Sequence, residues 1–182
     1  MPITLLGSSD FSARLAASLG LPFAFAAHFA PEMLLHAAQL YREHFRPSET
    51  LEYPWLMVAV PVIAAETNEA ARRLFTTPQQ RFLRLIRNQP VELLPPVDSM
   101  DELWNDFERA AVESRLREAI VGSESTVKAG LEKLVASTGA DEVIVVTDTW
   151  DHQARLDSYC RVAAIAAALQ EHKLIEPTTI AH

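Results

Sequence analysis

A glycine and three serines near the start of the chain form the strongest candidate for a ligand site. Gly7, Ser8, Ser9 and Ser12 follow the apolar run of residues 3–6, which predicts a short strand that turns into a helix. Gly7 allows a sharp turn and a close approach of the backbone to a ligand. The free N–H groups at the start of the helix attract an anion, and serine hydroxyls add further donors. The same residues also fit a plain helix cap, so an anion site and a structural cap stay open as alternatives.

Histidines are the second group of candidates. His28 follows residues 23–27, which we interpret as a buried strand. Its imidazole could move a proton, because the unperturbed pKa lies near 6.5, or it could simply be hydrogen-bonded at the strand end. His28, His36 and His44 lie at eight-residue intervals with no histidine pair at i,i+4 and no adjacent carboxylate cluster. We therefore expect no metal site.

Charged residues gather after the last predicted strand, residues 142–147. Asp148, Asp151, His152 and Arg155 could line a site at the end of that strand. Alternatively, Asp151 caps the last helix and Arg155 makes an ion pair that holds the segment in place.

Strand and helix patterns alternate along the chain, which predicts a β/α fold with a parallel sheet. The four predicted strands are residues 3–6, 23–27, 56–64 and 142–147. Residues 56–64 are apolar without alternation, which predicts cover on both faces, although Pro61 removes one ladder donor. Helical stripes are marked by Phe11, Leu15 and Leu19; by Leu34, Ala37, Ala38, Tyr41 and Phe45; by residues 67–88, with a possible break near Pro78; by Leu103, Phe107 and Ala111; by Val127, Leu131, Leu134 and Val135; and by Leu156, Tyr159, Ala163 and Ala166.

Composition narrows the class of protein. The chain has 182 residues, of which 49% are hydrophobic and 22% charged, as in an ordinary globular domain; we expect one domain over residues 1–176 and a frayed tail over residues 177–182. The net charge of −8 disfavours nucleic acid as a partner. A single cysteine, Cys160, cannot build a disulfide framework. The longest uncharged stretch, residues 15–31, is broken at Gly20-Leu21-Pro22 and has no basic leader, so we expect no membrane span and a cytoplasmic protein.

Six short motifs are spread along residues 3–168, and their order and spacing carry a resemblance to a known family. They are LLGSSDFSA at 5–13, LGLPFAFA at 19–26, HFAP at 28–31, VGS at 121–123, TGADE at 138–142 and DHQARL at 151–156. Together they resemble the later part of bacterial-luciferase-like flavin-dependent monooxygenases. The resemblance implies an α/β fold of the (β/α)8 TIM-barrel type. This chain would supply about four β/α units, strands five to eight, with a helical insertion before the last strand.

The first four units of such a barrel are absent from this sequence. An open four-stranded parallel sheet would need protection at both edges. Half a barrel would instead leave a large apolar surface that seeks a partner. On the second interpretation we expect self-association, so that the protein is a homo-oligomer.

The resemblance also implies a reaction. FMN would be the cofactor, with its phosphate bound by the turn that contains Gly7, Ser8, Ser9 and Ser12. His28 would be the catalytic residue, at the barrel face where active sites form. Reduced FMN would react with O2, and one oxygen atom would enter a small organic substrate. A separate flavin reductase or a nicotinamide donor would supply the electrons. The alternative is a non-catalytic flavin-binding or dimerising half barrel.

Overall fold

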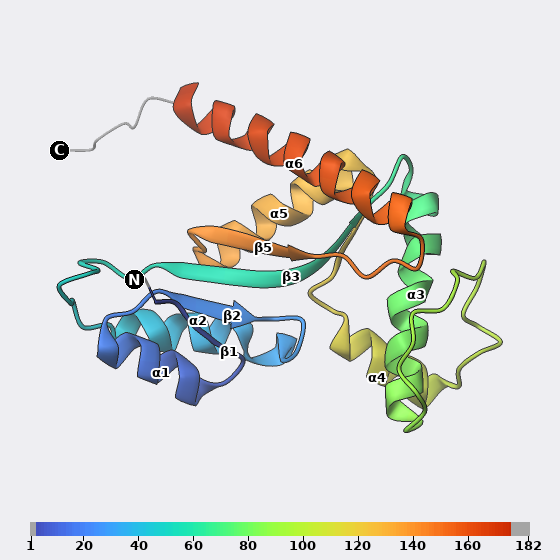
Figure 1. The fold of residues 1–182 in the computed structure, drawn as a ribbon, viewed down its shortest axis with the longest axis horizontal. Helices are drawn as coiled ribbons and strands as arrows, with labels where there is room; N and C mark the ends of the chain where they lie inside the picture. Colours follow the sequence, from blue (N-terminus) through green and yellow to red (C-terminus); the bar gives the residue numbers. More distant parts are fainter. Residues whose placement is uncertain (1–2, 176–182) are drawn as a thin grey trace.

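Five parallel strands form one sheet at the centre of the molecule (Figure 1). A computed structural model describes residues 3–175, with side chains through residue 169, so the predicted tail lies outside the described residues. The strands are β1 (Leu5–Gly7), β2 (Phe23–Ala26), β3 (Leu56–Ala64), β4 (Ile120–Gly122) and β5 (Glu142–Val146). The helices are α1 (Asp10–Leu19), the 3-10 turn η1 (Pro31–Met33), α2 (Leu34–Glu43), α3 (Asn68–Ile86), α4 (Asp106–Arg115), α5 (Glu124–Thr138) and α6 (His152–Ile175). The predicted β/α order is thereby confirmed, and β4 is a fifth strand that the sequence did not reveal, because three residues carry no periodicity.

Strand β3 organises the sheet. β2 pairs with its first residues along one edge, with Phe23 in register with Leu56. β5 pairs with the same part of β3 along the other edge, and β1 lies outside β2. β4 pairs only with the last three residues of β3. The spatial order β1-β2-β3-β5 is therefore a run of four parallel strands, with β1 and β5 at its ends.

Both faces of β3 are covered, as the uninterrupted apolar run predicted. Val58 and Val60 pack into the main core with the surrounding helices, while Ala59 and Ile63 are buried on the opposite face. Pro61 faces the same side as Ala59 and stands in register with Val146, the last residue of β5. The missing N–H therefore falls where the β3–β5 ladder ends.

The helix ends follow local rules. Gly20 ends α1 with a φ of 60°, a left-handed conformation that glycine adopts without strain. The buried Tyr41 hydroxyl donates to the Leu21 carbonyl at 2.8 Å and accepts from the Trp55 amide at 3.1 Å. Burial raises the pKa of this phenol. The Arg42 guanidinium donates to two carbonyls at the end of α5, each at 2.6 Å, and so joins α2 to α5.

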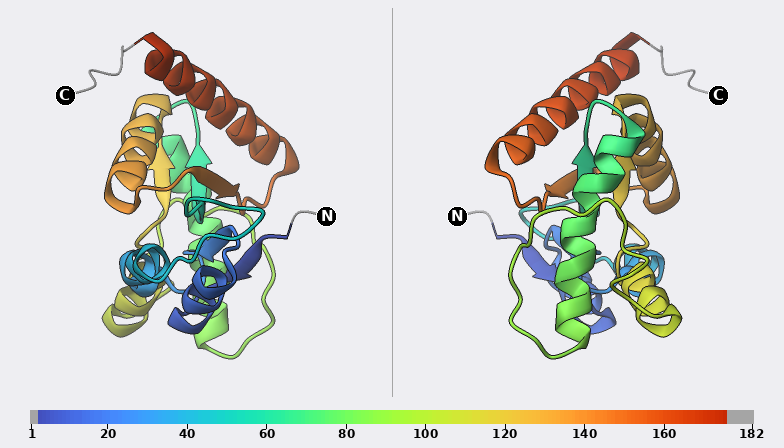
Figure 2. Two further views of the ribbon diagram at one scale, coloured as in Figure 1. Left: turned by 90° about the vertical axis from the view of Figure 1, so that its left-hand side faces the viewer. Right: turned by 90° about the vertical axis from the view of Figure 1, so that its right-hand side faces the viewer.

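Helix α3 runs through Pro78 without interruption and holds the proline-rich loop that follows it. Thr77 Oγ1 donates to the Leu94 carbonyl at 2.8 Å, and Gln80 Nε2 donates to the Pro95 carbonyl at 2.9 Å. These bonds explain why polar side chains are buried on this helix. In the right-hand view of Figure 2, α3 crosses in front of the strand ends. Among the described residues, no helix combines the length and the apolar character that a bilayer crossing requires.

Three apolar stripes do not face the core. On α1, the core face is Ala13, Ala16 and Ala17, while the predicted stripe of Phe11, Leu15 and Leu19 is exposed. On α6, Ser158, Val162 and Ile165 are buried, and the predicted stripe that contains Leu156 and Tyr159 is exposed. Near α4, Phe107 and Leu103 are exposed, and Val112 is the buried residue.

Candidate functional site

The turn after β1 is a helix cap, as one of the two alternatives from the sequence predicted. Ser9 is the N-cap of α1, and its backbone N–H donates to Ser12 Oγ at 3.2 Å, while Ser12 Oγ donates to the Ser9 carbonyl at 2.7 Å. A Cβ on Gly7 would lie 2.2 Å from Ser12 Oγ, so only glycine lets the serine lie against the strand end. The structure therefore brings Gly7, Ser9 and Ser12 together as the sequence predicted.

Several donors of this turn remain available to a ligand. Within residues 3–169, the Ser8 hydroxyl and the amides of Asp10 and Phe11 have no hydrogen-bond partner. The carboxylate of Asp10 would repel an anion, but its Oδ2 is turned toward α2, where it lies 3.2 Å from His36 Nε2. The donor set thus fits a phosphate group.

A cavity of about 420 Å³, which we call the mouth cavity, lies at the carboxyl ends of β2, β3 and β5. Its walls come from these strand ends, from α3 and from the segment around α4, and most of them are apolar. The lining residues are His28, Phe29, Pro61, Ile63, Phe75, Pro78, Arg81, Phe82, Leu85, Val91, Arg115, Leu116, Val146 and Asp148. Its size and apolar walls are typical of small-molecule sites, and it opens at the sheet edge where α/β proteins bind ligands.

Few polar groups enter the mouth cavity, and most are already paired. His28 is half-buried, and its Nδ1 lies 3.5 Å from the Ala59 carbonyl. Because a carbonyl only accepts, this contact favours the proton on Nδ1 and leaves the lone pair on Nε2. Arg81 on α3 forms an ion pair with Asp148, and Arg115 Nη1 donates to the Phe29 carbonyl at 2.7 Å.

The sequence analysis gave the charged residues after β5 two alternative roles, to line a site or to hold the segment in place, and the structure shows examples of both. Asp151 caps α6, as expected, by accepting from the Ala154 amide at 2.7 Å. Arg155 makes no ion pair among the described residues and donates instead to the Thr149 carbonyl at 2.8 Å, so that expectation was wrong. Asp148 does line the cavity, but the sequence did not predict its partner, Arg81. The i,i+3 and i,i+4 spacing of Pro78, Arg81 and Phe82 on one helix face could have signalled it.

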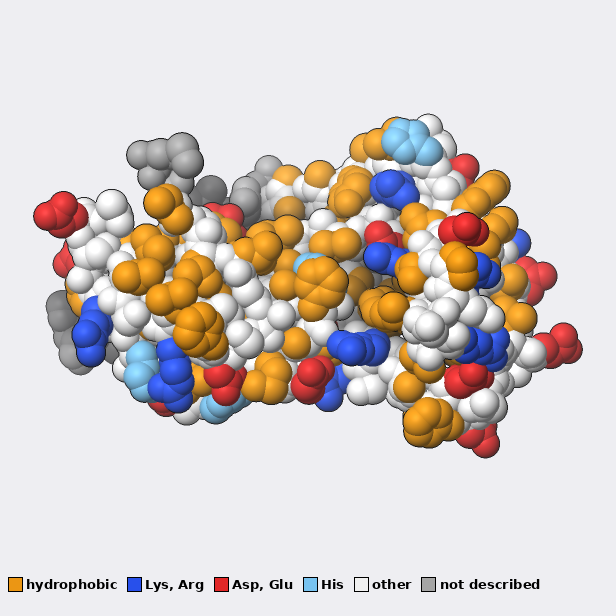
Figure 3. Space-filling model, turned by 60° about the horizontal axis from the view of Figure 1, so that its bottom comes forward, with side chains coloured by type: hydrophobic (Ala, Val, Ile, Leu, Met, Phe, Trp, Pro, Cys, Tyr) orange, Lys and Arg blue, Asp and Glu red, His pale blue; other side chains and the backbone are white. Residues whose placement is uncertain are grey.

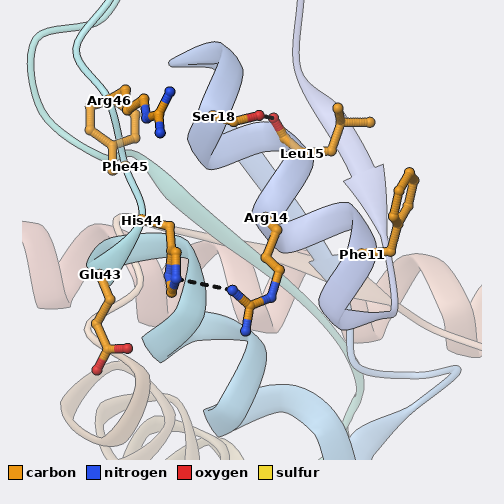
Figure 4. Close-up of a pocket in the computed structure, with 8 residues that line it drawn as sticks. All are labelled: Phe11, Arg14, Leu15, Ser18, Glu43, His44, Phe45 and Arg46. Atoms are coloured by element: carbon orange, nitrogen blue, oxygen red, sulfur yellow. Dashed lines mark hydrogen bonds between the residues drawn. The ribbon is translucent and has the colours of Figure 1, made fainter.

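A second hollow, the outer groove, lies between α1 and α2 and has a volume of about 620 Å³ (Figure 4). His44 Nδ1 lies 3.1 Å from the Leu40 carbonyl, and its Nε2 lies 2.9 Å from Arg14 Nη1. The groove is larger than the mouth cavity, but it lies in the helical layer and away from the strand ends. We therefore place the candidate site at the mouth cavity and the Gly7–Ser12 turn, which share one edge of the sheet.

Comparisons with known proteins identify the family of the chain. The sequence profile of the luciferase-like monooxygenase family matches residues 1–142. The uncharacterized protein YvbT of Bacillus subtilis (strain 168) is 50% identical over 165 residues, which are 91% of this chain and 49% of that protein. A protein named luciferase-like monooxygenase from Escherichia coli (strain K12) is 48% identical over 87% of this chain and 48% of its own length.

Solved structures share the fold. The crystal structure of apo-MsnO8 superposes with a TM-score of 0.74 at 30% identity, over 91% of this chain and 51% of that chain. The oxygenating constituent of 3,6-diketocamphane monooxygenase, solved in complex with FMN, superposes with a TM-score of 0.51 at 18% identity, over 79% of this chain and 41% of that chain. The chain thus spans about half the length of the relatives that it matches. From its sequence, and with the parallel β/α sheet in agreement, the chain belongs to the luciferase-like monooxygenase family.

Proposed function

We propose that this chain supplies barrel strands five to eight of a flavin-dependent monooxygenase, which oxidises a small organic substrate with one atom of O2 and reduced FMN as co-substrate. The observation that carries the proposal is that a helix-capping turn, whose Asp10 and Phe11 amides have no partner within residues 3–169, and an apolar cavity lie at the carboxyl edge of one parallel sheet. The FMN complex of one structural neighbour and the monooxygenase names of others support flavin chemistry.

In this proposal each part of the site has one task. Ser8, Ser9 and the first amides of α1 bind the phosphate of FMN, and Gly7 keeps the turn open. The walls of the mouth cavity exclude water from the reacting groups. FMN, when bound in reduced form, activates O2. His28, oriented by the Ala59 carbonyl through Nδ1, accepts a proton at Nε2.

The test is a titration with FMN, oxidised and anaerobically reduced, followed by oxygen consumption with reduced FMN. Gly7→Asp should abolish binding, because it places a carboxylate against the phosphate. Thr67→Ala is the matched control. It removes the N-cap bond of α3, in which Thr67 Oγ1 accepts from the Ala70 amide at 3.1 Å, and it leaves the Gly7–Ser12 turn unchanged. An unchanged Kd in Gly7→Asp would overturn the phosphate assignment.

A second candidate follows from the half-length match. A chain that spans about half of its relatives could bind flavin and associate without catalysing a reaction. FMN binding with no oxygen consumption above that of free reduced FMN, in wild type and His28→Gln alike, would favour this second function. Consumption that falls at least tenfold in His28→Gln would favour the monooxygenase.

A further inference from the structure

The helices at the two ends of the sheet expose apolar faces that have no cover within the described residues. On α1, the stripe of Phe11, Leu15 and Leu19 faces outward, and the phenyl ring of Phe11 is 74% exposed. Figure 3, which brings the α1 side of the molecule forward, shows apolar side chains gathered over this side. Three large side chains at four-residue spacing form a continuous strip, which is typical of a packed helix face.

Helix α6 also exposes an apolar face. Leu156, Tyr159, Ala163 and Ala166 lie at helical spacing on the side away from the sheet. Between residues 156 and 168 the helix carries one exposed charged side chain, Asp157, because Arg161 is half-buried and pairs with Glu124. A helix that is apolar nearly all round is normally buried.

These two helices follow the two open edges of the sheet. β1 pairs only with β2, and β5 pairs only with β3, among the strands that the structure describes. The uncovered face of these edge strands carries large apolar side chains, with Leu6 66% and Ile144 39% exposed, beside the exposed Glu142 at the start of β5. In Figure 1, α1 lies at the bottom and α6 at the top of the sheet. Parallel sheets are otherwise found buried, and open apolar edges invite pairing.

We infer that the occupant of both edges is a second copy of this chain. A two-fold axis along the strands sets β1 of one copy beside β5 of the other, and the second pair of edges meets in the same way. All strands run in one direction, so each new pair is parallel, as the existing pairs are. Two runs of four strands then make eight, the number that closes a barrel.

The same arrangement covers the exposed helix faces. α6 follows β5, and α1 of the other copy follows β1, so the two apolar faces meet over each seam. Each copy has two open edge strands, β1 and β5. The β1 edge of one copy pairs with the β5 edge of its partner, and the β5 edge pairs with the partner's β1 edge. This inference does not depend on the proposed function, because its test requires no flavin.

Cross-linking tests the edge pairing directly. Leu6→Cys and Ile144→Cys, each in a Cys160→Ser background, place thiols on β1 and β5. Within one copy these strands are separated by β2 and β3, roughly 14 Å across the sheet, which is beyond disulfide reach. With a short bis-maleimide linker, we expect a linked dimer from a mixture of the two single variants and none from either variant alone. The double variant should give a dimer and no larger species.

Three cross-linking results would overturn the inference. A linked dimer from Leu6→Cys alone would mean that β1 pairs with β1. A ladder of larger species from the double variant would mean an open chain of copies. No linked product from the mixture would mean that the edges do not meet.

Light scattering gives an independent readout. We expect twice the chain mass of 20.2 kDa at micromolar concentration. Leu19→Lys should weaken the dimer at least tenfold, because it places a charge in the seam. Leu35→Lys on α2 is the matched control, since Leu35 is 58% exposed and Leu19 52%, but it lies outside the seam. A monomeric wild type, or equal weakening by both substitutions, would contradict the inference.

Discussion

Gly7→Ala tests whether the turn after β1 is built around Ser12. The new Cβ would lie 2.2 Å from Ser12 Oγ and 2.3 Å from Ser12 Cβ, whereas ordinary contacts begin near 3.4 Å. The Cβ of Ser12 is attached to the helix backbone and cannot rotate away, so the start of α1 must shift by about 1 Å, the difference between 3.4 and 2.3 Å. The four hydrogen bonds between Ser9 and Ser12, which include the N-cap bond from the Ser12 amide to Ser9 Oγ at 3.4 Å, are then lost.

The cost can be worked out from those bonds. Loss of an N-cap interaction destabilises a protein by about 1–2 kcal/mol. For a chain of this length, that corresponds to a fall in Tm of about 2–8 °C. If the turn also binds the phosphate of FMN, the Kd for FMN should rise at least tenfold, because the donors move with the backbone. Thermal unfolding followed by circular dichroism and a fluorescence titration with FMN measure the two effects.

A control variant and a double variant test the reason given for this prediction. Gly130→Ala on α5 is the control, because its Cβ would come within 3.0 Å of one atom, the Cγ2 methyl of Ile120 at 2.5 Å, while the next two atoms lie at 3.4 and 3.5 Å. We expect a smaller change in Tm and no change in the Kd for FMN. In a Ser12→Gly background, Gly7→Ala should cost little more, because the clash is gone. An unchanged Tm in Gly7→Ala, or full additivity with Ser12→Gly, would refute the reasoning.

Three further predictions concern the fold. Tyr41→Phe should lower the free energy of unfolding by about 1–3 kcal/mol in urea titrations, because it leaves two part-buried backbone groups, the Leu21 carbonyl and the Trp55 amide, without this partner. Tyr159→Phe on the exposed face of α6 should change it little. Arg42→Met should cost about 1–2 kcal/mol, and a value near zero would show that the two bonds to the end of α5 are dispensable. The guanidinium of Arg87 holds the pKa of Glu108 down to about 2, from an ordinary 4.5. Because the pKa is lower in the folded state, the Glu108 carboxylate stabilises the fold above pH 4.5, and this stabilisation is lost as the pH falls toward 2. The Tm difference between wild type and Glu108→Gln should therefore shrink over that range.

Local chemistry explains most of what the sequence predicted correctly. Gly20 ends α1, Ser9 caps its start and Asp151 caps α6, and each of these features depends on residues within four positions. The long strand β3 was recognisable because burial on both faces removes alternation. The same local logic located the Gly7–Ser12 turn and placed His28 at a strand end.

What the sequence did not reveal depends on contacts between distant residues. Arg81 and Asp148 are 67 positions apart and meet only because α3 crosses the strand ends. Arg155 lies near several carboxylates in sequence, yet its guanidinium reaches the Thr149 carbonyl. β4 exists because the end of β3 extends beyond β5 and needs a partner. No periodicity in a single segment records such pairings.

The exposed stripes on α1 and α6 are a different kind of discrepancy. Periodicity reports which helix face is apolar, and in both helices it did so correctly. It does not report whether the face is covered by the same chain. Small residues, Ala13 and Ala16 on α1, pack against the sheet, where close approach is needed, and the larger side chains point outward. If solvent were the final environment, Phe11 and Leu19 would cost about 25 cal/mol for each Å² of apolar surface left in water, with no compensating contact. The second copy proposed above would cover these faces and remove that cost.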